Sequence, residues 1–249
     1  MPASSILIAS VIMCAAFAVG VFLLPHCAQR MLIRKFRQIS DCEPELEKMS
    51  ELGMIPYLEG RVRTYCEPLP YAWRVLSACA SALAAGILAI WSPHAPAALF
   101  TWLSLCFCAV MALVDARARI LPYEMTVALV PIALCFQTLQ ISAGIITIAR
   151  VVEGAALYCI VLFGSAGIAQ TATKKPALGH GDIRAAPGFA LLCAAFPFEA
   201  LATTALSIAI AFAIFRLCKV ESLSESAPFG PFLTLGAAVA MIACTVAPA

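Results

Sequence analysis

The stretch LFTWLSLCFCAVMALVDARAR, residues 99–119, is a run of apolar side chains that ends in an aspartate followed by two arginines. Its apolar part, residues 99–114, would extend about 24 Å as an α-helix. That length approaches the thickness of a bilayer's hydrocarbon core, about 30 Å. The stretch therefore predicts a membrane-spanning helix whose last turn places Asp115 at the boundary of the bilayer.

The composition of the whole chain supports a membrane setting. Of 249 residues, 63% are apolar and 12% are charged, and the mean hydropathy is +0.95. Soluble domains carry about 45–50% apolar and about 25% charged residues. The excess is too large for one water-soluble core, so we expect the bilayer to be the main solvent. A net charge of +2 gives no indication of a nucleic-acid partner.

Runs of similar character recur along the chain and predict an all-α polytopic membrane protein with about eight transmembrane helices. Cationic residues follow the first run, which places the N-terminus outside. With that orientation every Lys and Arg except Arg150 falls on the cytosolic side. The spans are expected near residues 5–25, 75–91, 97–114, 125–142, 148–169, 185–197, 200–218 and 229–247, of which 185–197 is too short to cross comfortably alone.

The chain divides into a first transmembrane helix (residues 1–25), a cytosolic loop (26–74) and a transmembrane core (75–249). Within the loop, residues 43–53 (EPELEKMSELG) predict a short helix with an acidic face. The loop contains Cys42 and Cys66 but no CxxC pair, so we predict no structural zinc and no metal site there.

Two acids lie at cytosolic ends of apolar runs, Asp115 after residues 99–114 and Asp182 before residues 185–197. An ionisable group at the membrane is costly and by default indicates function. Each acid also has a plain structural explanation. Asp115 could mark a helix end at the head groups, and Asp182 could cap the helix that follows it.

Three ordered segments resemble the type IV prepilin leader peptidases, which are GxGD intramembrane aspartic peptidases. They are ALVDARARILPYEMT (112–126), ALGHGDIR (177–184) and APFGPFLTLGA (227–237). The resemblance covers roughly residues 75–249. It implies that Asp115 and Asp182 are the catalytic pair and that Gly179, His180 and Gly181 form the active-site turn. The family often has Asp or Asn after Leu-Pro, where this chain has Tyr123.

The resemblance implies an aspartic endopeptidase of the bacterial inner membrane whose site faces the cytosol. Its substrates would be type IV prepilins or pseudopilins, cleaved after the Gly that ends a basic leader. Proteolysis needs no cofactor, whereas the N-methylation that many relatives perform would need S-adenosylmethionine. An acidic cluster in residues 26–74 could attract a basic leader, or could be a solvated helix face. It comprises Asp41, Glu43, Glu45, Glu47 and Glu51.

Two other functions remain open from the residues alone. A proton-coupled transporter would place acids near the bilayer midplane, and Glu153 within the fifth expected span is the one acid that fits. A non-catalytic assembly factor of a pilus or secretion system would need no acidic pair. Loss of either aspartate would then leave its function intact.

Overall fold

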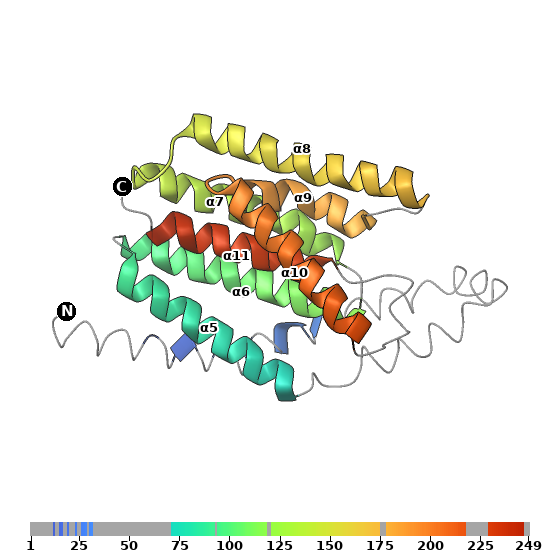
Figure 1. Ribbon diagram of the computed structural model, residues 1–249. Coiled ribbons are helices and arrows are strands. Elements are labelled where there is room, and N and C mark those ends of the chain that lie inside the picture. Colours follow the sequence, from blue (N-terminus) through green and yellow to red (C-terminus); the bar gives the residue numbers. More distant parts are fainter. Residues whose placement is uncertain are drawn as a thin grey trace, which may run out of the picture.

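The computed structural model describes residues 71–92, 94–118, 121–174, 178–217 and 229–246, together with isolated positions between 12 and 31. Figure 1 labels the helices in these ranges. They are α5 (Tyr71–Trp91), α6 (Ala95–Ala118), α7 (Tyr123–Ser142), α8 (Ile148–Thr173), α9 (His180–Leu192), α10 (Pro197–Leu217) and α11 (Gly230–Val246).

The chain is a multi-pass membrane protein with four helices long and apolar enough to span a bilayer among the described residues. These candidate spans are Ala95–Ala116, Tyr123–Ser142, Ile148–Ala172 and Pro197–Ile214. Helix α11 and residues Ala78–Trp91 of α5 are apolar but shorter. Helix α9 has 13 residues, too few to cross alone.

The prediction of an all-α polytopic membrane protein is thus confirmed, whereas four of the about eight expected spans are found as helices long enough to cross a bilayer among the described residues. A helix lies at every predicted span from residue 75 onward. The predicted span at 5–25 and the loop at 26–74 fall almost entirely outside the described residues, as does the short helix at 43–53. Helix α9 begins at His180 and ends at Leu192, five residues earlier at each end than the expected span 185–197.

Helices α6 and α11 form an antiparallel pair in the middle of the bundle (Figure 1). Near one end of the pair, the hydroxyls of Thr101 and Thr245 lie 2.8 Å apart. Near the other end, the backbone N–H of Gly230 donates to Asp115. We call the end that holds Asp115 and Gly230 the carboxylate end of the bundle.

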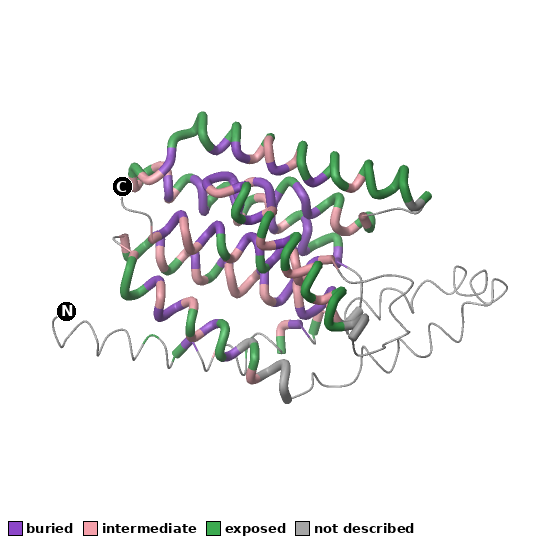
Figure 2. Tube along the Cα trace, in the orientation of Figure 1, coloured by how far each residue is buried: buried purple, intermediate pink, exposed green. Residues whose placement is uncertain are grey.

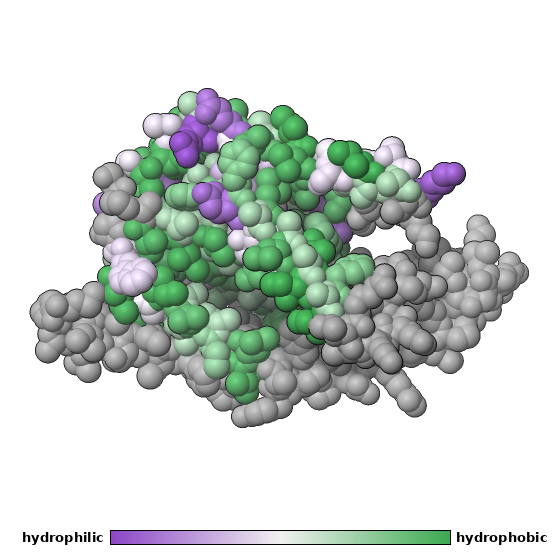
Figure 3. Space-filling view, in the orientation of Figure 1, coloured by the Kyte–Doolittle hydropathy of each residue, from purple (hydrophilic) through white to green (hydrophobic). Residues whose placement is uncertain are grey.

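The outer helices present apolar side chains outward. In α8, Ile160 and Ile168 are 69% and 72% exposed, and Leu206 of α10 is 62% exposed. Figure 2 shows exposed residues along both helices, while α9 and α11 are mostly buried. The described surface in Figure 3 is largely hydrophobic over these elements. Such a surface is expected where lipid, rather than water, surrounds the helices.

Helix α9 is held inside the bundle chiefly by α7. A Cβ on Gly188 would lie 2.6 Å from Leu129 Cγ, so glycine permits this close approach. The side-chain amide of Gln137 also donates to the carbonyl of Leu191. These contacts fix the short helix whose first turn carries Asp182.

Candidate active site

Asp115 lies in the last turns of α6 and is buried, with 5% of its surface exposed. A buried carboxylate requires hydrogen-bond donors, because desolvation of its charge is costly. The backbone N–H of Gly230 supplies one, with the nitrogen 2.8 Å from Asp115 Oδ2. The carboxylate that ends the apolar run of α6 is therefore bound by the chain far away in sequence.

Gly230 is the first residue of α11, so Asp115 lies at the N-terminus of that helix. The first N–H groups of a helix lack partners within the helix and carry the positive end of its dipole. A Cβ on Gly230 would lie 2.7 Å from Asp115 Oδ2 and 3.1 Å from Asp115 Cγ. Glycine is thus the residue that lets the start of α11 approach the carboxylate.

Asp182 lies in the first turn of α9, where Gly179 precedes the helix in extended conformation. The Gly179 N–H donates to Asp182 Oδ2 at 3.2 Å. The suggestion that Asp182 is the N-cap of this helix was therefore wrong. The N-cap is Gly179, and Asp182 is the third residue of the helix. The side chain does help to satisfy the helix start, and this leaves its second oxygen for other partners.

Asp182 lies within the electrostatic range of Asp115. The negative charge of Asp115 acts on Asp182 and, after burial as the larger cause, raises the pKa of Asp182. The Gly179 N–H opposes this rise, and the resulting pKa of Asp182 is about 6 against an ordinary 3.8. Two carboxyls that share a site cannot both ionise easily. The arrangement can therefore hold one proton between two carboxyls.

The first turn of α9 packs on the connection between α6 and α7. A Cβ on Gly181 would lie 3.0 Å from Leu121 Cβ, and Leu121 is itself buried. Pro122, next to it, precedes α7 with φ −58° and ψ 139°, in the range typical of proline. The two segments that carry Asp115 and Asp182 are thus in direct contact beside the carboxyls.

Arg184 and Tyr123 form a second link between these segments. The guanidinium carbon of Arg184 lies 5.6 Å from the centroid of the Tyr123 ring, within range of a cation–π interaction. His180, at the middle of the expected active-site turn, begins α9 and is exposed. The structure therefore places Gly181 and Asp182 inward and His180 at the surface.

The remaining expectations fall outside the described residues. These include the acidic cluster Asp41, Glu43, Glu45, Glu47 and Glu51 and the loop cysteines Cys42 and Cys66. Their roles stay predictions.

Sequence reasoning missed the Gly230–Asp115 hydrogen bond and the Arg184–Tyr123 contact. For the Gly230–Asp115 hydrogen bond, the sequence signal was the glycine that lies between two prolines in the segment 228–231. For the Arg184–Tyr123 contact, the sequence signal was Tyr123 itself, which stands where the family often has Asp or Asn after Leu-Pro.

The chain is similar in sequence to known proteins. A protein of Pectobacterium carotovorum subsp. carotovorum, named prepilin leader peptidase/N-methyltransferase, is 32% identical over 165 residues. The aligned region covers 64% of this chain and 56% of that protein, so the chain spans little more than half of its relative's length. No solved structure matches the chain. The family described as type IV leader peptidases matches residues 102–246, which include both aspartates and Gly230, and the chain belongs to that family.

Proposed function

We propose that this chain cleaves the leader of type IV prepilins or pseudopilins, using Asp115 and Asp182 as the catalytic pair. The observation that carries the proposal is the buried Asp115 held by the N–H of Gly230, within electrostatic range of Asp182, in the region that the family matches. Of the two carboxyls, one is buried and bound to a helix N-terminus, and the other has a pKa of about 6. Family membership supplies the reaction class.

The hydrogen bonds suggest a division of roles. Asp115 accepts the shorter backbone hydrogen bond, 2.8 Å against 3.2 Å for Asp182, and N–H donors stabilise a negative carboxylate. Burial and the charge of the partner carboxyl favour one proton on the pair, and Asp182, which accepts the longer hydrogen bond, is the member with less stabilisation of its negative charge. We therefore assign Asp115 as the ionised base and Asp182 as the protonated acid.

The reaction then follows from these two protonation states. Asp115 takes a proton from water while the oxygen of that water attacks the scissile carbonyl carbon. Asp182 gives its proton to the carbonyl oxygen, which becomes a hydroxyl of the tetrahedral intermediate. Collapse of the intermediate breaks the C–N bond, and the proton held by Asp115 passes to the leaving nitrogen. Asp182 recovers its proton from the hydroxyl, which restores the pair.

The setting of this reaction is also part of the proposal. The distribution of Lys and Arg supports a carboxylate end that faces the cytosol, in the bacterial inner membrane. A cytosolic site would reach a basic leader before the apolar segment of a pilin precursor leaves the membrane. The acidic residues of the 26–74 loop would then favour the approach of that leader.

N-methylation of the new N-terminus is a separate proposal, which rests on the name of the similar Pectobacterium protein. It would require S-adenosylmethionine, a charged molecule with a purine ring. The pocket between α5, α6 and α11 is lined mainly by apolar side chains and does not suit such a molecule. We therefore derive no step through this cofactor, and a mass measurement decides whether the reaction occurs.

The test is cleavage of a type IV prepilin in membranes that contain the wild type, Asp115→Asn or Asp182→Asn. Glu153→Gln, an exposed acid of α8, is the matched control, and it also tests the transporter alternative. We expect both dyad variants to lose cleavage at normal membrane levels while Glu153→Gln cleaves normally. An added 14 Da on the product, the mass of one methylene, would show methylation. Cleavage by either dyad variant would overturn the aspartic mechanism and bring the transporter or assembly alternatives forward.

A further inference from the structure

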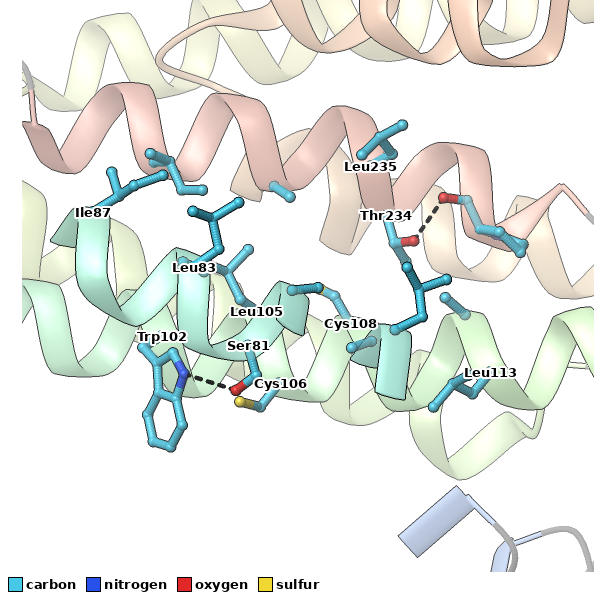
Figure 4. Close-up of a pocket in the computed structure, with 18 of the residues that line it drawn as sticks. Ser81, Leu83, Ile87, Trp102, Leu105, Cys106, Cys108, Leu113, Thr234 and Leu235 are labelled. Carbon is cyan, nitrogen blue, oxygen red and sulfur yellow. Dashed lines mark hydrogen bonds between the residues drawn. The ribbon is translucent and has the colours of Figure 1, made fainter. Parts of the chain in front are cut away.

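A groove runs along the bundle between α5, α6 and α11, with a cavity volume of about 410 Å³. Helices α5 and α11 form its walls and α6 forms its floor, as Figure 4 shows. Its lining extends from Trp102 to Ala116 along α6. This corresponds to about 21 Å of helix, or roughly two thirds of a hydrocarbon core.

The lining of the groove is almost entirely apolar, and small side chains make it accessible. Alanines contribute from all three helices, including Ala84, Ala109 and Ala238. Small residues at such positions let another helix approach closely inside a membrane. Two polar groups at one side already have partners: the Trp102 indole N–H donates to the Ser81 hydroxyl at 3.2 Å, and that hydroxyl donates to the carbonyl of Ala16 in the N-terminal segment at 3.0 Å. The groove thus offers packing contacts rather than hydrogen bonds.

One end of the groove coincides with the candidate active site. Ala116 and Pro231 line it there, and they directly follow Asp115 and Gly230 in the chain. Those two neighbours are joined by a hydrogen bond. A molecule lying in the groove would therefore have one of its ends next to Asp115.

We propose that this groove docks the apolar helix of the substrate, with the scissile bond at the carboxylate end. This inference rests on the proposed function, because it takes the occupant to be a precursor with an apolar segment after its leader. A peptide helix explains why the groove ends at Asp115. A lipid acyl chain would fill apolar space equally well but would have no reason to end at two carboxyls.

The proposal also assigns a role to α5. This helix precedes the matched family region, which begins at residue 102, yet it supplies one wall of the groove. Leu83 on α5 and Leu235 on α11 project from the opposing walls in Figure 4, and they are 62% and 48% exposed. These two side chains would contact opposite sides of a docked helix.

A photo-crosslinking residue at Leu83 or Leu235 tests the contact. The protein would be held in membranes with a type IV prepilin that keeps its leader and apolar segment, in the wild-type and Asp182→Asn backgrounds. Matched controls carry the crosslinker at Ile160 of α8 and Leu206 of α10, which are similarly exposed and apolar. We expect crosslinks to the prepilin at both groove positions, at least tenfold above the controls.

A groove-filling substitution gives a second measurement. Ala238→Leu places a larger side chain in the groove, and Ala156→Leu makes the same change on the exposed face of α8. We expect Ala238→Leu to raise KM for the prepilin about tenfold at nearly unchanged kcat, and Ala156→Leu to change neither.

The outcomes separate this inference from the proposed function. If the wild type cleaves, and both dyad variants fail to cleave, but no prepilin is crosslinked at Leu83 or Leu235, the groove proposal is wrong and the peptidase proposal stands. Crosslinks to lipid that persist at saturating prepilin would also contradict docking of a peptide helix. Absence of cleavage by the wild type would instead remove the function on which the inference depends.

Discussion

The backbone nitrogen of Gly230 lies 2.8 Å from Asp115 Oδ2, so the first residue of α11 binds the carboxylate at the end of α6. The contact joins residues 115 positions apart, and it places Asp115 where the partial positive charge of a helix N-terminus is greatest. This hydrogen bond therefore joins two of the segments that resemble the family, residues 227–237 and residues 112–126.

Gly230→Ala should reduce cleavage at least tenfold. The added Cβ would lie 2.7 Å from Asp115 Oδ2, so either the carboxylate or the start of α11 must shift. The measurement is prepilin cleavage, with membrane abundance determined in parallel. Gly164→Ala on α8 is the matched control, because a Cβ there has no neighbour within 4 Å. Equal cleavage by both variants would show that the close approach is unnecessary.

Gly181→Val should also abolish cleavage without unfolding the protein. A Cβ at this position would lie 3.0 Å from Leu121 Cβ, and valine adds two methyl groups to that contact. Asp182, the next residue, would move away from Asp115. Gly167→Val on α8 makes the same change where a Cβ meets open space. A Gly181→Val protein that is absent from membranes would indicate a folding role and contradict this prediction.

The pH profile should show activity that falls as the pH rises from about 6 through neutrality. The mechanism needs one proton on the pair, and the pKa of Asp182 is about 6 because of burial and the charge of Asp115. Above that value kcat/KM should decline about tenfold per pH unit. The apparent pKa belongs to the pair of carboxyls as a unit.

The profile would be measured between pH 5 and pH 9 in membranes. His180→Gln is the control, since His180 is the exposed side chain of the same turn. An unchanged falling limb in His180→Gln assigns the proton to the dyad. Activity confined to below about pH 5, as in soluble acid proteases, would contradict the prediction.

Hydropathy predicted much of this architecture, because lipid-facing helices must be apolar along their whole length. It succeeded for α6 and α8, which are long and apolar enough to cross a bilayer. It could not give the bounds of α9, because this helix is buried by protein on several sides and its length is not set by the bilayer.

The resemblance of the ordered motifs to the family suggested that Asp115 pairs with Asp182. Hydropathy alone predicted only that each aspartate lies at the boundary of the bilayer. The contact of Asp115 with Gly230 depends on antiparallel packing of α6 and α11, which leaves no local signal in the sequence. The groove was not predicted for the same reason, since it is formed by three helices.

The Arg184–Tyr123 contact should contribute modestly to the site. Cation–π interactions at exposed positions are worth about 0.5–1 kcal/mol. Arg184→Ala or Tyr123→Leu should therefore lower cleavage at most about fivefold, and Tyr123→Phe should retain the wild-type rate because its ring keeps the π face. The measurement is kcat/KM for the three variants. Complete loss in Arg184→Ala would show that this cation contacts substrate or the carboxyls.

The polar cluster at the opposite end of the bundle should affect stability rather than catalysis. Thr245 Oγ1 accepts from the Gln140 amide at 3.0 Å and lies 2.8 Å from Thr101 Oγ1, so one hydroxyl joins α11 to α7 and α6. Thr245→Val keeps the shape but leaves the buried Gln140 amide without this acceptor. Inter-helix hydrogen bonds in membranes average about 0.6 kcal/mol and reach about 1.7, and an unsatisfied buried group costs about 1–3 kcal/mol.

Thr245→Val should therefore lower the thermal midpoint by a few degrees in detergent, with normal cleavage well below that midpoint. Thr138→Val on α7 is the matched control, because its exposed hydroxyl donates only to Leu134 of its own helix among the hydrogen bonds described. Both ends of α11 are then tested separately, since Gly230→Ala perturbs the carboxylate end and Thr245→Val perturbs the other. Loss of cleavage in a stably folded Thr245→Val protein would mean that α11 transmits changes along its length to Asp115, and the two ends could no longer be treated as independent.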